Sequence, residues 1–301
     1  MLNRQLKSTV LVIAYNRPDL FSKLLNSFEN SIDSNSQFVV IVHQVGNSQV
    51  QDLISQFSSR HELVHVIPTT GANATAMANI SFNRLTGYDY CFDSLMSDYV
   101  IAFEDDVVMS TDILKFSEFI MCKHWDEKDF KGINFGSYVK FNEATSKEYS
   151  KVRHGIHGPA SAIHKNTWIQ FNKSIARSRA NSTHWDGAIE YMLKTGFMVC
   201  PINSRYMDYG HGGTHAPALS SDLHFVKLND SYTNNYLRNN FVYTLTKNSI
   251  PWMVDMPIYS SRENWKYRLL YFFNSRNNLY IFYKIERLMY KLFILKKKAR
   301  A

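Results

Sequence analysis

Three adjacent carboxylates, Glu104, Asp105 and Asp106, are the side chains of this sequence best placed to do chemistry. They follow residues 99–103, an apolar run typical of a buried β-strand. Like charges at this spacing repel, and each carboxylate raises the pKa of its neighbours. A divalent cation would relieve the repulsion, and oxygen ligands suit magnesium or manganese. The other interpretation is a solvated acidic turn that precedes a helix beginning near Thr111.

The first hundred residues alternate between apolar runs and stretches with helical periodicity. The predicted strands cover 9–14, 38–42, 63–67 and 99–103, and the predicted helices begin at Pro18 or cover 50–57 and 72–85. Strands that are apolar throughout and separated by helices indicate an α/β fold with a mostly parallel sheet covered on both faces. Ligands of such folds bind at the carboxyl ends of the strands, which is where the three carboxylates lie.

Several motifs give the sequence a resemblance to a known enzyme family. The first strand ends in Ala14-Tyr15-Asn16-Arg17-Pro18, and residues 100–116 read VIAFEDDVVMSTDILKF. These segments resemble inverting glycosyltransferases of the GT-A type, which have a Rossmann-like nucleotide-sugar-binding fold. More narrowly, they look like family 13, the N-acetylglucosaminyltransferase I type, which transfers N-acetylglucosamine from UDP. Further matches, which extend the resemblance over about 9–229, are Trp185-Asp186, 200–205 and 225–229.

The resemblance implies a role for each matched residue near the acidic triplet. Asp106 would be the direct ligand of Mn²⁺ or Mg²⁺, which neutralises charge on the departing diphosphate. Glu104 and Asp105 would face the sugar and ribose of the donor, and Ala14 and Arg17 would lie against the nucleotide. The implied cofactor is therefore a divalent metal ion, and the implied partner is a nucleotide-sugar donor.

The same resemblance implies an acceptor side in the second half of the chain. Asp186 matches the family's catalytic base, which takes a proton from the acceptor hydroxyl during attack on the anomeric carbon. Glu190, four residues later on the same helical face, is the reserve candidate for this base. His157 and Gly158 resemble the turn that lines the acceptor side, and the alternative for them is a simple loop. Trp185 either stacks on a sugar ring or packs in the core.

The glycine-rich stretch 209–216 has two interpretations. It is either a lid over the donor diphosphate, with His211 or His215 near phosphate or metal, or a surface loop with two uninvolved histidines. The sequence favours neither.

The sequence departs from the family's pattern in three places. Val45 stands where the family has an acidic residue near the uracil, and Ile80 or a neighbour replaces a histidine. Gly187 and Ala188 replace the Asp-Trp that follows the family's base. The motifs therefore support the metal site and the reaction type more directly than the identity of the donor.

The net charge of +8 is concentrated at the C-terminus. Residues 265–301 contain ten Lys and Arg and one acidic residue, whereas residues 1–264 contain 24 basic and 25 acidic residues. A nucleic-acid-binding body would carry its own basic face, so we expect no nucleic-acid partner. Within the C-terminal tail (256–301), apolar residues recur at helical spacing at Ile281, Ile285, Leu288, Leu292 and Leu295. This pattern predicts an amphipathic helix on an anionic membrane surface through 265–301, or a helix packed on the body or on a second subunit.

Three domains and a cellular location follow from these patterns. We expect a nucleotide-sugar-binding half (1–107), an acceptor-binding and catalytic half (108–255) and the basic aromatic tail (256–301). The three cysteines are widely spaced, which favours reduced thiols, and residues 1–8 lack the pattern of a signal peptide or anchor. These features predict a cytoplasmic protein, peripheral on the inner face of a bacterial cell membrane.

The predicted function is a metal-dependent inverting glycosyltransferase of surface polysaccharide assembly. It would move a sugar from a UDP-sugar to a saccharide or lipid-linked acceptor. In the family that the motifs resemble, this sugar is N-acetylglucosamine. A nucleotidyltransferase remains an alternative, but it usually has a glycine-rich basic loop where this sequence has residues 15–18. A non-catalytic membrane scaffold is the other alternative, and it would have no need for the acidic triplet together with Asp186. The oligomeric state stays open.

Overall fold

The computed structural model describes residues 5–70, 76–136, 149–152, 159–172, 196–201 and 204–210, all within one compact unit, Met1–Trp252. The strands are β1 (Ser8–Ala14), β2 (Phe38–Gln44), β3 (Val64–Thr69), β4 (Tyr99–Glu104), β5 (Val107–Met109), β6 (Phe130–Asn134), β7 (Tyr149–Val152), β8 (Ala160–His164), β9 (Phe197–Pro201) and β10 (Tyr206–Asp208). The α-helices are α1 (Pro18–Glu29), α2 (Ser48–Arg60), α3 (Ala76–Asp89), α4 (Ile113–His124) and α5 (Lys165–Asn172). Short 3₁₀ and π-helical segments cover Ser34–Ser36 and Tyr90–Ser94.

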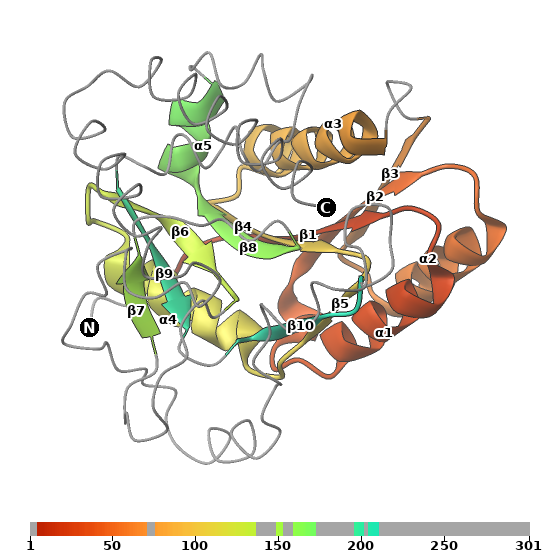
Figure 1. Cartoon of the computed structure of the whole chain (residues 1–301), viewed down its shortest axis with the longest axis horizontal. Coiled ribbons are helices and arrows are strands. Elements are labelled where there is room, and N and C mark those ends of the chain that lie inside the picture. The colour runs from red at the N-terminus through yellow and green to blue at the C-terminus, as the bar shows by residue number, and fades with distance from the viewer. Residues whose placement is uncertain are drawn as a thin grey trace, which may run out of the picture. The chain divides into compact units, whose positions relative to one another are not determined.

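Eight strands form one sheet in the order β3-β2-β1-β4-β8-β6-β9-β7 (Figure 1). The first four are parallel neighbours, and β6 is parallel to β9. Only β8 and β7 run antiparallel to the strands beside them, so six of the eight strands point the same way. The predicted α/β fold with a mostly parallel sheet is confirmed.

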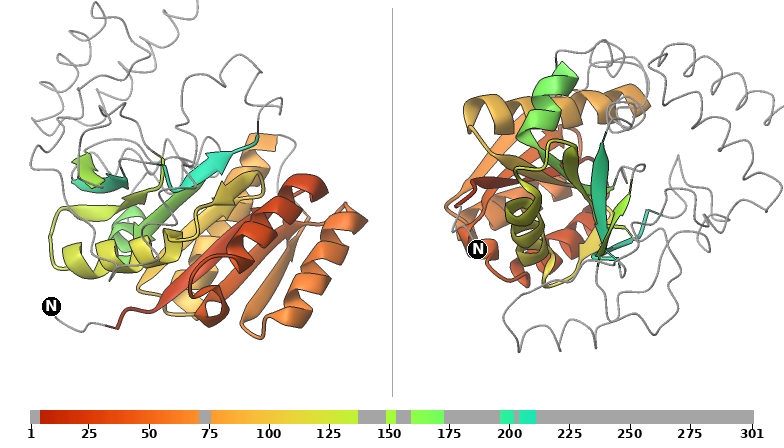
Figure 2. Two further views of the ribbon diagram at one scale, coloured as in Figure 1. Left: turned by 90° about the horizontal axis from the view of Figure 1, so that it is seen from below. Right: turned by 90° about the vertical axis from the view of Figure 1, so that its left-hand side faces the viewer.

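Helices cover both faces of this sheet (Figures 1 and 2). Along β1, Val10 and Val12 pack with apolar side chains of α1, α2 and α4, whereas Leu11 and Ile13 pack with those of α3 and α5. The alternation follows from the period of two in a strand, and both sets are apolar because the strand is buried on both sides.

The strand register brings the carboxyl ends of the parallel strands to one edge of the sheet. Ile13 of β1 lies beside Glu104 of β4, and Ala14 lies beside His43 of β2. Gln44 in turn lies beside Thr69 of β3. The loops that follow β1 and β4, which carry Arg17 and the acidic triplet, therefore meet at this edge.

The predicted boundaries of β1 to β4 agree with the structure to within two residues, but the prediction for α3 was wrong at its C-terminus. The sequence suggested that this helix ends at Leu85, before Thr86 and Gly87, yet it continues to Asp89. Gly87 lies against the sheet, where a Cβ would overlap the Leu11 side chain and lie 3.0 Å from Val42 Cγ2. The glycine allows close packing of helix on sheet.

A second, two-stranded sheet of β5 and β10 extends from the end of β4. It is anchored by an ion pair between Arg205 Nε and Asp112 Oδ2 at 3.1 Å, with both side chains at most 5% exposed. Asp112 also accepts a hydrogen bond from Ser110 Oγ at 2.8 Å, and the Arg205 guanidinium lies 5.1 Å from the centre of the Phe116 ring. These contacts fasten the start of β10 to the start of α4.

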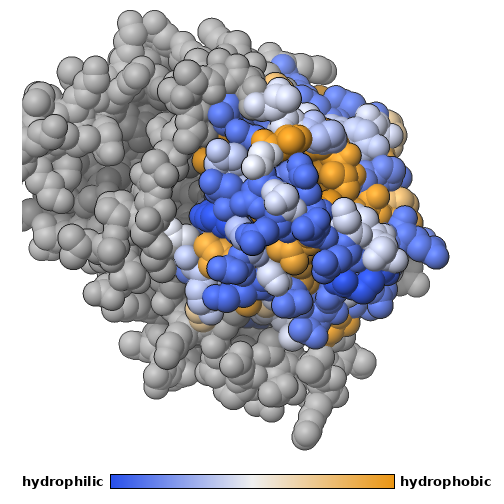
Figure 3. Space-filling view, turned by 90° about the vertical axis from the view of Figure 1, so that its right-hand side faces the viewer, coloured by the Kyte–Doolittle hydropathy of each residue, from blue (hydrophilic) through white to orange (hydrophobic). Residues whose placement is uncertain are grey.

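Small apolar patches separated by hydrophilic side chains cover the side of the molecule that carries α1, α2 and β3 (Figure 3). In the edge strand β3, the apolar side chain of Val66 is 41% exposed. Among the helices described, none combines the length and the apolar character that crossing a bilayer requires.

We predict that Asp112→Asn lowers the free energy of unfolding by about 3 kcal/mol, because it removes the negative charge that faces the buried Arg205 guanidinium. Urea denaturation at neutral pH measures this change. Glu118→Gln is the control, since its pair with Lys115 is exposed and contributes less than about 1 kcal/mol. A loss for Asp112→Asn no larger than the control's would mean that the ion pair does not anchor β10.

Candidate active site

The acidic triplet occupies the turn between β4 and β5. Glu104 is the last residue of β4, and its backbone N–H donates to the Pro159 carbonyl at 2.9 Å, at the start of the neighbouring β8. Asp105 and Asp106 make the turn itself and are only 2% and 7% exposed. The three carboxylates are therefore held by the sheet and are not a solvated surface turn.

Arg17 forms ion pairs with two of these carboxylates at once. Its guanidinium makes a short contact from Nη2 to Asp105 Oδ1, and Nη1 donates to Asp106 Oδ2 at 2.6 Å. Burial alone would lower the pKa of Arg17, but attraction to Asp105 and Asp106 outweighs it, so the pKa is raised. Arg17 reaches the triplet because it immediately precedes α1, where Pro18 at the first helical position fixes the chain direction.

The loop after β1 is also tied to the triplet through its backbone. The Tyr15 N–H donates to Asp105 Oδ2 at 3.0 Å. Burial raises the pKa of Asp105, while Arg17 acts in the opposite direction. Ala14, which the resemblance places against the nucleotide, is fully buried at the end of β1 directly beneath this loop.

Glu104 has a separate partner on α3. Arg84, which is fully buried, places Nη1 3.5 Å from Glu104 Oε1. Burial raises the pKa of Glu104 to about 7, with a further rise from Asp106 and Asp105 that Arg84 and Arg17 oppose.

The structure adds Asp208, a carboxylate that the sequence analysis did not identify. In the antiparallel pairing of β5 and β10, Asp208 lies opposite Val107 and therefore next to Asp106. The backbone N–H of Tyr209 donates to the Asp106 carbonyl at 2.7 Å, which locks the two segments together. A three-residue strand paired with a distant segment leaves no periodic signal in the sequence, and the only hint was the adjacent glycine-rich stretch.

The residues present fit a divalent cation at Asp106. Asp106 Oδ1 is buried without a hydrogen-bond partner, an arrangement that is costly unless a ligand satisfies it. Gly210 lies directly against the same carboxylate, because a Cβ there would overlap Asp106 Oδ2. The described residues contain no group of three or more His, Cys, Asp or Glu side chains that could hold a metal on their own. Oxygen atoms of a bound diphosphate would therefore have to complete the coordination.

Two of the positions that depart from the family pattern lie in described segments. Val45 follows β2 and is 47% exposed. Ile80 lies on α3 and packs against the core on that face of the sheet. An exposed apolar side chain therefore stands where the resemblance places an acidic residue near the base of the nucleotide.

The remaining predicted site residues lie outside the described residues. They comprise the base and its reserve, the aromatic beside it, the acceptor turn and the histidines of the glycine-rich stretch: Asp186, Glu190, Trp185, His157, Gly158, His211 and His215. The C-terminal tail is likewise outside. These roles remain predictions.

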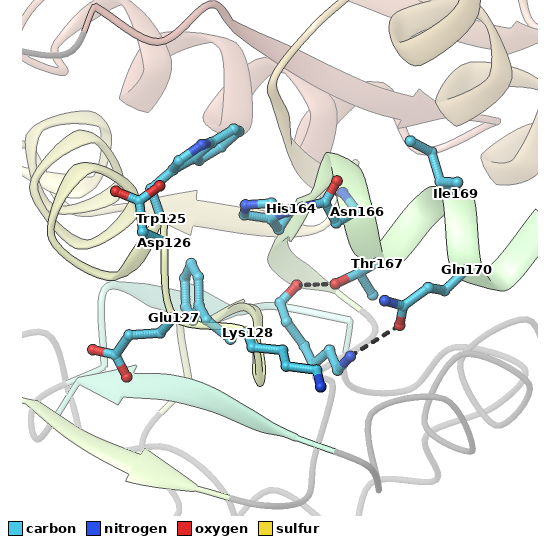
Figure 4. A pocket seen from close by; sticks show the side chains of 11 residues that line it. Trp125, Asp126, Glu127, Lys128, His164, Asn166, Thr167, Ile169 and Gln170 are labelled. Atoms are coloured by element: carbon cyan, nitrogen blue, oxygen red, sulfur yellow. Dashed lines mark hydrogen bonds between the residues drawn. The ribbon is translucent and has the colours of Figure 1, made fainter.

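A cavity of about 400 Å³ lies at the other end of the sheet (Figure 4). Its lining includes His164, which pairs with Tyr99 at the start of β4, away from the acidic triplet at the strand's end. Burial lowers the pKa of His164 to about 4, so the ring is neutral at physiological pH. Lys131 Nζ donates to Gln170 Oε1 at 2.9 Å across the cavity wall. Among the predicted site residues that the structure describes, none lines this cavity.

Comparison with known proteins yields no matching family model and no matching curated protein. Among solved structures, S. aureus TarS 1–349 is similar with a TM-score of 0.47 and 12% identity over 66% of this chain and 59% of that chain. A TarS 1–349 complex with UDP-GlcNAc is similar at a TM-score of 0.43 and 11% identity, over 66% of this chain and 57% of that chain.

Two further solved structures come from other organisms. The mannosyltransferase PcManGT from Pyrobaculum calidifontis, in complex with GDP-Man and Mn²⁺, matches at a TM-score of 0.39 and 14% identity over 56% of this chain and 47% of that chain. A cytidylyltransferase from Leptospira borgpetersenii matches at a TM-score of 0.36 and 11% identity over 56% and 64%. The chain thus spans less than two thirds of each of these relatives. At TM-scores below 0.5 the function has to be argued from the site itself.

We predict that the metal-free protein loses stability as the pH rises from 4.5, the ordinary pKa of a glutamate, to about 7. In this window the folded protein keeps the Glu104 proton that the unfolded chain has released, so raising the pH favours unfolding. The slope from this one group is at most about 1.4 kcal/mol per pH unit. Urea denaturation in EDTA across this range measures it.

Glu104→Gln should flatten this part of the stability profile, because glutamine does not titrate. Glu118→Gln, which changes an exposed glutamate, should leave the profile as it is. An unchanged slope in Glu104→Gln would show that Glu104 ionises in the folded protein as it does in the unfolded chain.

Proposed function

We propose that this protein is a metal-dependent inverting glycosyltransferase that uses a nucleotide sugar. The observation that carries the proposal is the partly neutralised carboxylate of Asp106 at the carboxyl edge of a parallel sheet. One of its oxygens, Oδ1, is buried without a hydrogen-bond partner. Nucleotide ligands of α/β folds bind at this edge.

The donor that we propose is a UDP-sugar, and by resemblance UDP-N-acetylglucosamine. When bound, a divalent cation would neutralise charge that develops on the diphosphate leaving group. Arg17 is the residue of this chain suited to hold that diphosphate. Its side chain is 35% exposed, and the guanidinium, which contacts Asp105 and Asp106, carries the positive charge that a diphosphate beside these carboxylates would meet. Asp105 holds the Tyr15 backbone and thereby fixes the loop that carries Arg17.

In the proposed transfer step, Asp186 accepts the proton of the acceptor hydroxyl while the oxygen attacks the anomeric carbon. The bond between that carbon and the diphosphate oxygen breaks, and the electron pair leaves with the diphosphate. A single displacement of this kind inverts the configuration of the sugar. We propose a saccharide or a lipid-linked saccharide as the acceptor, in surface polysaccharide assembly.

The described loop after β1 argues against the nucleotidyltransferase alternative. Its side chain and backbone donors, from Arg17 and Tyr15, are directed to Asp105 and Asp106. A nucleotidyltransferase would instead use a glycine-rich loop there to surround a triphosphate.

The test of this function is a donor screen. We expect Mn²⁺-dependent release of UDP from a UDP-sugar, loss of the activity in EDTA, and no release from GDP-sugars. Asp106→Ala should abolish the release while the circular dichroism spectrum stays unchanged. Asp186→Asn should lower kcat by about 100-fold or more with little change in donor affinity, because asparagine cannot accept the proton.

Three results would contradict the proposal in different ways. Undiminished activity in EDTA would remove the metal from the mechanism. Release of pyrophosphate from a nucleoside triphosphate and a sugar phosphate would identify a nucleotidyltransferase. No turnover of any nucleotide would support a non-catalytic protein. Asp52→Asn, an exposed change on α2, is the matched control that should behave like the unaltered protein.

We also propose that the C-terminal tail holds the enzyme on an anionic membrane surface through residues 265–301. The support is the concentration of ten basic residues among aromatic side chains in that segment. A chain that ends at Arg262 should lose binding to anionic vesicles yet still release UDP from the donor. Full-length protein that ignores such vesicles at low salt would overturn the membrane proposal. A truncated chain that fails to fold would place the tail in the core or in a subunit interface.

A further inference from the structure

We propose that the cavity at the start of β4 and β6 binds a sugar that carries a carboxylate group, and that Lys131 holds this carboxylate. The cavity of about 400 Å³ is lined by residues 125–128, which follow α4, and by side chains of β6, β8 and α5 (Figure 4). This volume is within the range of small-molecule sites. The inference goes beyond the proposed function, because the cavity is a second site that no residue of the acidic triplet lines.

Lys131 brings a buried positive charge to the cavity wall. The residue is 5% exposed, and burial lowers the pKa of its ammonium group, although attraction to Asp129 acts in the opposite direction. Its Nζ donates to the uncharged side chain of Gln170 at 2.9 Å. Among the residues that the structure describes, no carboxylate lies within ion-pair distance of Nζ. A buried charge without a counter-charge is unfavourable, and a bound anion would remove this cost.

The surrounding elements fix the direction of the Lys131 side chain. Its backbone carbonyl accepts from Thr167 Oγ1 at 2.9 Å, and its Nζ donates to Gln170, one turn further along α5. The aliphatic part packs against Gly196, where a Cβ would lie 2.7 Å from Lys131 Cε. The ammonium group is therefore already in place when a ligand enters, which lowers the entropic cost of binding.

The acidic residues of the lining lie away from this ammonium group. In Figure 4, the carboxylates of Asp126 and Glu127 are on the side of the cavity opposite Gln170, to which Lys131 is bonded. Glu127 has partners of its own, because its Oε1 lies 2.6 Å from His124 Nδ1 and its Oε2 lies 2.5 Å from Lys151 Nζ. The side of the cavity next to α5 is therefore the side that suits an anion.

The charge of this side selects a carboxylate over a phosphate. One buried ammonium balances the single negative charge of a carboxylate, whereas a phosphate monoester carries about −1.5 to −2 at neutral pH. The other lysine of the lining, Lys128, is exposed, so solvent and salt screen its charge.

The rest of the lining suits the hydroxyl groups and the ring of a sugar. The amide side chains of Asn166 and Gln170 are exposed at the cavity. Because an ammonium group only donates, the Gln170 atom bonded to Lys131 is the carbonyl oxygen, and the NH₂ group remains as a donor for a hydroxyl. Trp125 and Phe130 add aromatic surface for the apolar face of a sugar ring. A carboxylate as small as acetate would leave these groups unused.

The test is binding of sodium glucuronate to the full-length protein, measured by ligand-observed NMR titration with glucose and acetate as comparison ligands. EDTA is present throughout, because a carboxylate would otherwise bind to metal ions. We expect glucuronate to bind about 10-fold or more tightly than either comparison ligand. Glucose lacks the charge-assisted hydrogen bond to Lys131, and acetate lacks the hydroxyl groups.

Two variants separate a ligand-binding lysine from a purely structural one. Lys131→Met keeps a long side chain but removes the charge. Gln170→Glu keeps the contact between β6 and α5 as an ion pair, and its carboxylate takes the place of the ligand's carboxylate. We expect each to weaken glucuronate binding by about 10-fold or more. Lys165→Gln, a change on α5 outside the cavity lining, should bind as the unaltered chain does.

Several results would contradict the inference. Glucuronate that does not bind, or that binds Gln170→Glu as tightly as the unaltered chain, would show that Lys131 only connects β6 to α5. Equal affinity for acetate and glucuronate would remove the sugar from the inference, and tighter binding of inorganic phosphate would remove the carboxylate. Thermal unfolding checks that each variant folds, and if Lys131→Met does not, Gln170→Glu decides. The donor screen tests the proposed function separately, because glucuronate binding requires neither a nucleotide sugar nor a metal.

Discussion

The cost of holding several carboxylates together at the end of one buried strand is the constraint on which this structure depends. Asp105 and Asp106 are almost fully buried, and such charges are tolerated only when they are paired. Arg17 provides that pairing from the residue that precedes α1, and so connects the first strand–helix unit to the end of β4. The same ion pairs that stabilise the turn thereby hold the Arg17 side chain at the carboxyl edge of the sheet.

The neighbouring elements support this arrangement from two directions. Fully buried Arg84 reaches Glu104 from α3, which packs closely on the sheet because of Gly87. On the other side, β10 is fixed to β5 through its backbone and to α4 through Arg205 and Asp112. The three carboxylates of the triplet are thus paired with two arginines, Arg17 at the start of α1 and Arg84 on α3. The site therefore depends on the packing of helices on both faces of the sheet.

The part of this arrangement that is local in sequence could be predicted. The continuous apolar runs predicted β1, β2 and β4, because a strand buried on both faces is mostly apolar. The strand that ends at Glu104 placed the triplet at the ligand-binding edge. The predicted end of α3 at Leu85 was wrong. Gly87 has a low helix propensity, but it lies within the helix because it packs against Leu11, and that tertiary contact is not visible in the local sequence. Asp208 was missed for a related reason. Its importance comes from pairing with β5, and pairing between segments far apart in a chain leaves no local pattern.

An acidic turn at the end of a strand is not by itself a functional site. The turn that carries the triplet differs from a structural turn because its carboxylates are incompletely neutralised. A purely structural cluster would be expected to satisfy every buried oxygen, yet Asp106 Oδ1 has no partner, and burial holds the pKa of Glu104 near 7. Such a cluster gains stability when a cation binds to the folded state. The fold thus tolerates a local deficit of positive charge at the position where ligand binding would remove it, and deficits of this kind are concentrated at functional sites.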